Sequence, residues 1–590
     1  MKKCLTLYTL LSLQLCNTLF ASEDLAVVNK CPVDCKTSRN FFHMRAFSSS
    51  SIREIYMIKP MYMADKPNEF GWRKTFAFAL EYMTNFGGQC TQGCNANLGS
   101  LPFWSGTNTM TYGTNDGNSD LDAYQFGMGE MSNQGTISLN VNIMHVGCDL
   151  LFQATHNNHN RGFYCTIRAP IGAMTIDTNL KEKPAVHDYA ADFQTEQIWL
   201  QYPSIANQYT TLTEAFQAGI LSSSTNIIIQ SGTHKPFALD KARFSAYRLV
   251  AIRIADLCAS FGYSFYNSDN GFISLGAKFI APTGNMPTGR HVLEPVFGHA
   301  AHWGVGAEVT GHYKIWEDAR KDRGLDFWVK GDVMHLRSGR RPNYRTFDLK
   351  QNGPGSKYLL IQKYFLSTPT ATNPTGAIPS YITQAANITT LPVISRFNIE
   401  GTAAVVFDFH ERNWNIAVGA EYWCRGHESL NLDAVHLLHV DAAILNEYAV
   451  LGRQVSDDSR NYLYNPSGEA VLSVHLCEPL ATINKSLPRV LGTGTPPTVS
   501  PPTPPYPEGI ADARLASNRI PQDLNQALDV QGAATQQAMT AKLSGQFGYT
   551  WKEYRFTPNL SLIANGEFAL GGGNATINTY SVGAQGSVSF

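Results

Sequence analysis

The C-terminal segment of the chain alternates between apolar and polar positions. In residues 580–590 one row of side chains is apolar or small and the other row is polar or glycine. Because neighbouring side chains of a strand point to opposite faces, this pattern predicts a strand with one apolar and one wetted face. The chain then ends in an aromatic residue, Phe590. An amphipathic edge strand of another kind of sheet would give the same alternation.

The same period of two recurs along much of the chain. The clearest further segments are residues 257–265, 273–279, 305–315, 325–333, 397–409, 414–422, 541–551 and 560–570. Less regular candidates are residues 76–82, 137–143, 146–154, 163–167, 247–254 and 356–365. Many of these segments are about ten residues long, which is longer than most strands of soluble sandwiches. The pattern therefore favours strands that cross a membrane.

The N-terminus has the layout of a secretory signal peptide. Lys2 and Lys3 precede a mostly apolar run that ends at Ala21, and charge returns at Glu23. We expect cleavage after Ala21 and export of the mature chain. An uncleaved anchor is the alternative, because the run is just long enough to span a bilayer. No later window holds 18 consecutive apolar residues, so a membrane form of the mature chain would have to be a closed barrel.

Composition and motifs exclude several classes of function. Charged residues make up 16% of the 590 residues and aromatic residues 11%, and the formal net charge is −1. This near-neutrality argues against nucleic acid as a partner. The sequence contains no Gly-x-Ser-x-Gly, Gly-x-x-x-x-Gly-Lys-Ser/Thr or His-Glu-x-x-His motif. We therefore expect no enzyme, no cofactor and no metal site, although a barrel hydrolase with widely spaced catalytic groups remains an alternative.

Taken together, these features resemble bacterial outer-membrane β-barrel porins and transporters. Tyr580, Val588 and Phe590 resemble the C-terminal assembly signal of that class. The stretch Pro282-Thr283-Gly284 resembles a strand-to-loop signature of barrels proposed to pass small organic compounds. Members of the fatty-acid transporter family carry Asn-Pro-Ala near the mature N-terminus, where this chain has Cys-Pro-Val at residues 31–33. The resemblance implies a channel in the outer membrane for passive diffusion of small solutes.

The resemblance also implies partners and leaves other functions open. The implied partners are the lipid bilayer of the outer membrane, the barrel-assembly machinery and a small solute. A surface-exposed binding protein or adhesin, anchored by the barrel, is the main alternative. A barrel-borne hydrolase is a further one.

The predicted fold is all-β: a transmembrane, antiparallel, up-and-down β-barrel with large, partly helical loops. Fifteen candidate strands are an odd number, and single-chain bacterial barrels have an even one, so we expect about 14 strands, with 12 or 16 as alternatives. The expected organisation is a signal peptide at 1–21, a periplasmic segment or plug at 22–70, barrel strands at 71–425 with a long loop at 175–240, a large insertion at 426–540 with a Pro-rich stretch at 488–507, and C-terminal strands at 541–590. Strand parity predicts that the insertion lies outside the cell.

The polar row of each predicted strand should face the barrel lumen. The candidate lumen-lining residues are Glu308, His312, Lys314, Asp326, Lys330, Asp332, Glu400, Asp408, Glu421, Lys542 and Glu567. Charges of mixed sign would keep a water-filled pore hydrated. Alternatively, these residues pair with one another and seal a packed lumen.

The cysteines are interpreted for an oxidising compartment. Cys31 and Cys35 have the same spacing as Cys90 and Cys94, which favours two short disulfide loops or cross-links between them. A site with four cysteine ligands for a metal is the alternative. Cys148 and Cys165 fall on the predicted lipid face of neighbouring strands, where buried thiols are expected.

Overall fold

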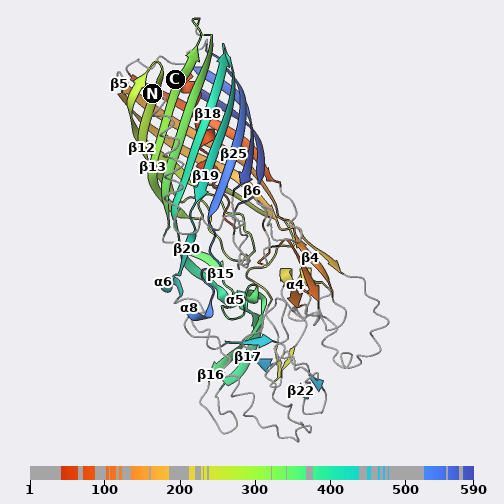
Figure 1. The fold of residues 1–590 in the computed structure, drawn as a ribbon. Helices are drawn as coiled ribbons and strands as arrows, with labels where there is room; N and C mark the ends of the chain where they lie inside the picture. Colours follow the sequence, from red (N-terminus) through yellow and green to blue (C-terminus); the bar gives the residue numbers. More distant parts are fainter. Residues whose placement is uncertain are drawn as a thin grey trace, which may run out of the picture.

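Twelve strands form one closed antiparallel barrel (Figure 1). The computed structural model describes residues 42–63, 71–86, 101, 103–104, 107–113, 119–122, 134–158, 161–184, 211–218, 227–229, 232–234, 238–320, 322–339, 342–366, 377–437, 448–452, 463–464, 470–471, 476–477, 524–552, 556–570 and 576–590. The barrel strands are β1 (Gly71–Asn85), β5 (Asn142–Asn158), β6 (Arg161–Asp177), β11 (Leu257–Ser268), β12 (Gly271–Ala281), β13 (His302–Glu317), β14 (Arg323–Ser338), β18 (Thr390–Glu411), β19 (Trp414–Arg425), β25 (Ala538–Thr550), β26 (Thr557–Ala569) and β27 (Thr579–Ser589).

Each barrel strand pairs with the strands that precede and follow it in this order. The ring closes where β1 pairs with β27 on one side and with β5 on the other. Closure leaves no sheet edge with unpaired backbone groups, which is a condition for a barrel surrounded by lipid. The predicted fold class, an up-and-down antiparallel barrel, is confirmed.

The expected number of about 14 strands is corrected to 12, one of the two alternatives. Three candidate segments lie outside the barrel. β10 (Leu249–Ile254) pairs with β6 beyond the point where β11 does, so it continues the line of β11 and adds no barrel strand. β4 (Gly135–Leu139) and β16 (Leu360–Leu366) belong to small separate sheets. Any sheet with one buried face gives an alternating sequence, so alternation alone could not exclude them.

The outer face of the barrel is apolar. Large exposed side chains follow alternate positions of the strands, among them Leu275, Phe279, Val305, Phe407, Val418, Leu543, Leu562 and Val582. The intervening positions are buried and mostly polar, as in β27, where Ser581, Gln585, Ser587 and Ser589 are buried. The sequence of each strand therefore fixes which of its faces meets lipid.

The two ends of the barrel differ in the length of their connections. At one end, only two residues separate β5 from β6, β11 from β12 and β18 from β19. At the other end, the connections between β1 and β5, β6 and β11, β14 and β18, and β19 and β25 each exceed fifty residues. The C-terminus lies at the short-turn end, and the long connections gather beyond the opposite end (Figure 1).

The long connections form what we call the loop-end region. β18 runs for 22 residues, past the barrel rim, and there pairs with β15 (Asn343–Thr346) and β20 (Glu428–Leu432). In its described part, the loop-end region also contains four small sheets. Two of them have four strands each: β2 (Thr109–Gly113), β3 (Leu121–Asp122), β4 and β7 (Leu180–Pro184) in one, and β16, β17 (Ala377–Gln384), β21 (Tyr448–Gly452) and β24 (Leu476–Cys477) in the other. The other two have two strands each: β8 (Ile227–Ile229) with β9 (Gly232–His234), and β22 (Leu463–Tyr464) with β23 (Ala470–Val471). The described helices of the loop-end region are α4 (Leu212–Ala218), η5 (Ser356–Tyr358), α5 (Ala385–Thr389), α6 (Ala434–Leu437) and α8 (Leu524–Ala527). An apolar core that includes Phe103, Trp104, Phe216 and Tyr358 joins many of these elements.

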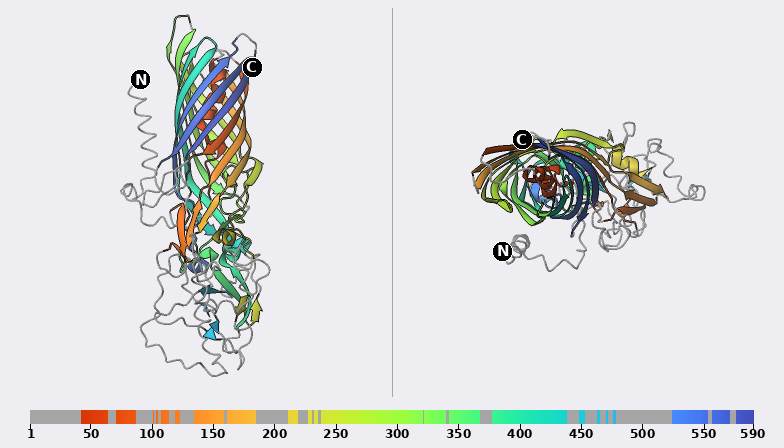
Figure 2. Two further views of the ribbon diagram at one scale, coloured as in Figure 1. Left: turned by 90° about the vertical axis from the view of Figure 1, so that its right-hand side faces the viewer. Right: turned by 90° about the horizontal axis from the view of Figure 1, so that it is seen from above.

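One helix lies inside the barrel. α2 (Ser51–Met63) follows the short η2 (Phe47–Ser49) and is enclosed by the strands when the barrel is viewed along its axis (Figure 2). It packs against β1, β14, β18, β19, β26 and β27. Within the part of the chain that the structure describes, no helix is long and apolar enough to cross a membrane.

Candidate functional site

Residues 42–63, which we call the lumen segment, occupy the interior of the barrel. Ile52, Ile55 and Tyr56 pack against an apolar patch of the wall that includes Trp328 and Val406. Met57 and Ile58 pack on the opposite side against β1 and β5. A helix that is buried on every face needs a partner in every direction, and the closed wall provides them.

The charged residues of α2 each meet an opposite charge on the wall. Arg53 lies 2.5 Å from Glu81 of β1 and 3.5 Å from Asp149 of β5. Lys59 lies 2.7 Å from Asp408 of β18.

Glu54 binds the other side of the wall. It lies 3.3 Å from Arg168 of β6 and 2.9 Å from Lys330 of β14. The helix is thus tied to five strands by its charges alone. Breaking a single buried pair would leave an uncompensated charge, which is strongly destabilising.

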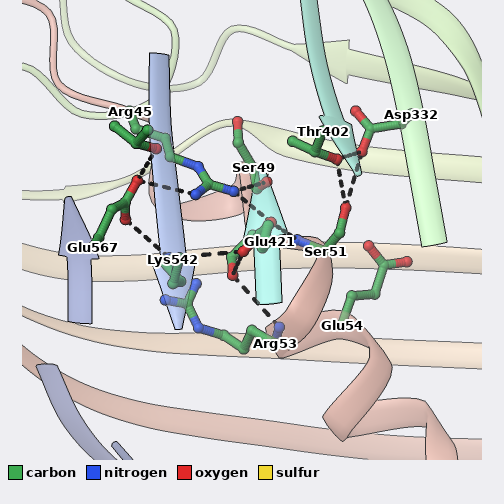
Figure 3. A network of polar contacts seen from close by, with 12 residues as sticks. Arg45, Ser49, Ser51, Arg53, Glu54, Asp332, Thr402, Glu421, Lys542 and Glu567 are labelled. Carbon is green, nitrogen blue, oxygen red and sulfur yellow. Dashed lines mark hydrogen bonds and ion pairs between the residues drawn. The ribbon is translucent and has the colours of Figure 1, made fainter. Parts of the chain in front are cut away.

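A second cluster holds the start of the helix (Figure 3). Arg45 lies 2.5 Å from Glu421 and 3.1 Å from Glu567, and Lys542 lies 3.1 Å from Glu567. Glu421 also accepts a hydrogen bond of 2.7 Å from the backbone N–H of Ser51. A carboxylate at this position satisfies a free N–H of the first helical turn and complements the helix dipole.

The eleven predicted lumen-lining residues all project to the inner side of the wall. Besides Lys330, Asp408, Glu421, Lys542 and Glu567, the wall contains close pairs that do not involve the lumen segment: Glu308 with Lys330, His312 with Asp326, Lys314 with Glu317, and Asp332 with Lys278. Glu400 lies near His299. His312 and Lys314 are partly exposed and the other nine are buried. In this conformation each of the eleven side chains lies near a group of opposite charge.

Other residues of the site were not among the predicted ones. These are Arg45, Arg53, Glu54 and Lys59 of the lumen segment, and Glu81, Asp149, Arg168, Lys278 and Arg425 of the wall. The wall members follow the same alternation as the predicted residues. Extending the candidate strand at 163–167 by a single residue would have included Arg168.

The buried charges of the wall are unequal in sign. On the described barrel strands, nine carboxylates and five Lys or Arg side chains are buried: Glu81, Asp149, Glu308, Asp326, Asp332, Glu400, Asp408, Glu421 and Glu567 against Arg168, Lys278, Lys330, Arg425 and Lys542. The lumen segment brings three cations, Arg45, Arg53 and Lys59, and one carboxylate, Glu54. Its net positive charge therefore offsets part of the excess of acid on the wall.

A buried histidine cluster lies where the lumen segment meets the loop between β12 and β13. Nδ1 of His299 is 2.7 Å from Asp256, and its Nε2 is 3.2 Å from both Ser49 Oγ and Glu400. Burial lowers the pKa of His299, but Glu400 and Asp256 outweigh this effect and raise the pKa to about 10.

The cluster has the order of a Ser-His-Asp triad, but its charge state is unsuited to that chemistry. A pKa of about 10 leaves His299 protonated at neutral pH, so its ring cannot take the proton of Ser49. Ser49 instead donates a hydrogen bond of 2.8 Å to Glu400. The cluster therefore joins the lumen segment, the β12–β13 loop, the turn between β10 and β11, and β18.

A cavity of about 50 Å³ remains beside the lumen segment. Its apolar lining includes Phe42, Phe47, Met83, Phe297 and Ile577, and its polar lining includes Arg45, Arg53, Glu81, Lys542 and Glu567. Such a volume holds a few water molecules at most.

The remaining predicted sites are placed as follows. Tyr580, Val588 and Phe590 are exposed on the outer face. Cys148 and Cys165 are free thiols, as are Cys258 and Cys424. Cys31, Cys35, Cys90 and Cys94 lie outside the described residues, and so do the signal peptide and the Pro-rich stretch. Among the residues that are described, no group of His, Cys, Asp and Glu could hold a metal ion.

No protein-family model and no curated protein matches the sequence. Solved structures that are similar include an outer membrane channel from Pseudomonas putida F1, at 8% identity and a TM-score of 0.32, covering 88% of this chain and 96% of that one. A FadL homologue of Pseudomonas aeruginosa has 9% identity and a TM-score of 0.25, with 90% and 93% covered. The toluene transporter TbuX of Ralstonia pickettii has 7% identity and a TM-score of 0.24, with 95% and 98% covered. These neighbours are outer-membrane barrel channels and transporters, the class that the sequence resembles.

Proposed function

We propose that the chain is an outer-membrane channel for the passive diffusion of small solutes, and that the lumen segment is a plug that closes it. The observation that carries this proposal is the charge complementarity between the lumen segment and the wall. A barrel that served only as an anchor would need no separate cationic segment inside it. Four charged residues of this segment, Arg45, Arg53, Glu54 and Lys59, each meet wall residues of opposite sign.

The ion pairs are the part of the contact between plug and wall that can separate most readily, whereas the apolar contacts of α2 resist separation. When an apolar core separates, both surfaces lose contacts that water cannot replace. When an ion pair separates into a hydrated lumen, water and salt ions take the place of each partner. The wall exposed in this way would carry more carboxylates than cations, and the open channel should therefore favour cations over anions.

Conductance in planar bilayers tests the proposal. The refolded mature chain should show little conductance, and deletion of residues 42–63 should open a stable, cation-selective pore. A matched control is the variant Arg323→Gln, which removes an exposed ion pair at the barrel rim and should stay closed. A deletion variant that forms the barrel yet passes no current would overturn the proposal.

A cross-link tests whether the plug has to move. Ser51 Oγ and Thr402 Oγ1 lie 2.6 Å apart, on α2 and β18. Under any condition that opens the wild type, the pair Ser51→Cys and Thr402→Cys should stay closed when oxidised and open when reduced. Because Cys148, Cys165, Cys258 and Cys424 are free thiols, the wild type treated with the same oxidant is the control. Equal currents in both redox states would mean that solutes pass without movement of α2.

We also propose that the mature chain reaches the outer membrane through a cleaved signal peptide and the barrel-assembly machinery. The apolar outer face and the difference between the two barrel ends support this location, because outer-membrane barrels have short periplasmic turns and long outer loops. The loop-end region, including the insertion at 426–540, would then face the outside of the cell.

A second candidate function is a surface binding protein that the barrel anchors. The observation in its favour is that the largest apolar core among the described residues extends through the loop-end region rather than the lumen. Truncation within 426–540 separates the two functions. It should abolish binding to a surface partner and leave conductance unchanged if this second candidate is right.

A further inference from the structure

One pair of neighbouring strands carries opposite electrostatic arrangements at its two ends. At the short-turn end, Arg323 of β14 is directly opposite Glu411 of β18, and the two side chains form an exposed ion pair of 2.6 Å. At the loop end of the same two strands, Arg337 is directly opposite Arg396. Like charges placed directly across a sheet repel each other. A bound anion would therefore stabilise the arrangement of Arg337 and Arg396.

No carboxylate of the residues that the structure describes forms an ion pair with either arginine. Arg337 and Arg396 are both exposed, and they alternate with the buried Leu336 and Phe397, so they project from the outer face of the wall. Within the described ranges, neither guanidinium group has an ion-pair partner. This contrasts with Lys314 and Arg323 near the other rim, which each lie within 3 Å of a carboxylate.

The position of the two arginines points to a lipid. Trp303 of β13 is directly opposite Arg337, and it is 57% exposed. Toward the barrel middle, the next outward residues are the exposed Val305 of β13 and, directly opposite it, the exposed His335 of β14. The following outward residue of β14 is the exposed Val333, and both valines belong to the apolar band. A Trp beside the end of an apolar band marks the depth of lipid headgroups. A molecule that contacts Trp303 and both arginines must therefore have an apolar part below and an anionic part at this level.

We propose that Arg337 and Arg396 bind the phosphate group of an anionic lipid in the leaflet at the loop end of the barrel. Two guanidinium groups can each donate paired hydrogen bonds to phosphate oxygens, and a phosphomonoester carries enough charge to neutralise both. The acyl chains of the lipid would lie along Val305 and Val333. This site rests on the proposed location of the barrel in a membrane, but not on the movement of the plug.

Lipid titration of the refolded mature chain, followed by native mass spectrometry, tests the site. The probes are dioleoyl phosphatidic acid, dioleoyl phosphatidylcholine and inorganic phosphate. The wild type should retain phosphatidic acid in preference to the other two. Arg396→Glu should weaken its binding about tenfold or more, because that variant gives Arg337 an internal partner like the one that Arg323 has. Arg323→Gln is the matched control at the other rim and should bind like the wild type.

Three results would overturn the site. Equal retention of phosphatidic acid by the wild type and Arg396→Glu would show that the two arginines do not bind it. Inorganic phosphate that binds as tightly as phosphatidic acid would exclude a lipid ligand. An equal loss of binding in Arg323→Gln would indicate a general charge effect. Conductance of the same samples tests the proposed channel separately, since neither arginine faces the lumen.

Discussion

The two faces of the barrel wall impose different demands on their side chains. On the outer face, Val418 or Leu562 meets lipid, and any apolar side chain of similar size would serve. On the inner face, Glu421 needs Arg45, and Asp408 needs Lys59, each from a particular position of a segment outside the barrel sheet. The outer face thus requires only that its side chains be apolar, whereas the inner face requires particular charged side chains opposite particular partners. Four variants test this difference, ordered from the largest expected effect to the smallest.

Deletion of Phe590 should prevent the outer face from forming at all. The backbone of Phe590 exchanges two hydrogen bonds of 2.9 Å with Lys74 of β1, and these are the last bonds of the closing strand pair. Without them and without the terminal aromatic, we expect the chain to be exported and to accumulate as a protease-sensitive species, measured by fractionation and by heat-modifiability on gels. The control is Ser589→Ala, which loses one buried hydrogen bond to Thr75 and should assemble nearly normally. A normal yield without Phe590 would contradict its role in assembly.

Glu421→Ala tests the inner face. The change leaves Arg45 with Glu567 alone and removes the acceptor of the Ser51 N–H. Because it breaks a buried pair, we expect a loss of about 3–5 kcal/mol in the free energy of unfolding, together with a higher open probability in bilayers. Glu411→Ala is the matched control. Its ion pair with Arg323 is half-exposed, so the loss should be ~1 kcal/mol or less. Equal effects of the two changes would argue against pairing as the basis of the inner face.

Val418→Arg tests the outer face. Val418 is 63% exposed in the middle of β19, where an arginine in lipid should reduce the free energy of unfolding by ~2–4 kcal/mol. Val418→Met, which keeps the site apolar, should change it little. Unfolding by urea in lipid vesicles measures both. Equal stability of the two variants would mean that this row does not meet lipid.

His299→Gln tests whether the charge of His299 stabilises the fold in a way that depends on pH. The pKa of about 10 lies above the ordinary value of 6.5, so the stabilisation from the His299 charge is complete below pH 6.5 and is lost as the pH rises toward 10. We expect the variant to be less stable than the wild type by roughly 1–3 kcal/mol at pH 6, with a smaller difference at pH 10. A difference that grew with pH would mean that His299 is neutral in the folded chain.

The barrel strands could be located from the sequence because the position of each depends on its own alternating side chains and not on a distant partner. Each of the twelve barrel strands overlaps a candidate segment, because lipid selects an apolar row wherever a strand crosses it. The same reasoning added β4, β10 and β16, because the alternation of a strand does not reveal what covers its apolar face. It predicted lumen-lining residues on β13, β14, β18, β19, β25 and β26, but it could not tell an open pore from a filled one.

The lumen segment could not be derived in the same way. α2 contains Arg53, Glu54 and Lys59 among apolar side chains on every face, so its sequence does not show the one-sided pattern of a surface helix. These three charges can be buried only because Glu81, Arg168 and Asp408 stand opposite them, and these partners are 28, 114 and 349 positions away in the chain. Pairing over such separations leaves no trace in a local pattern.

The seam between β1 and β27 has a consequence for the order of folding. Thr75 and Ser589, which meet at this seam, are 514 positions apart in the chain, so their contact carries the largest loop-closure entropy of the barrel and should form late. α2 directly precedes β1 in the chain and packs against both strands of the seam. Because α2 is tethered to β1, we expect it to lie within the curled, unclosed sheet before β27 arrives, so that the seam closes around a helix that is already in place.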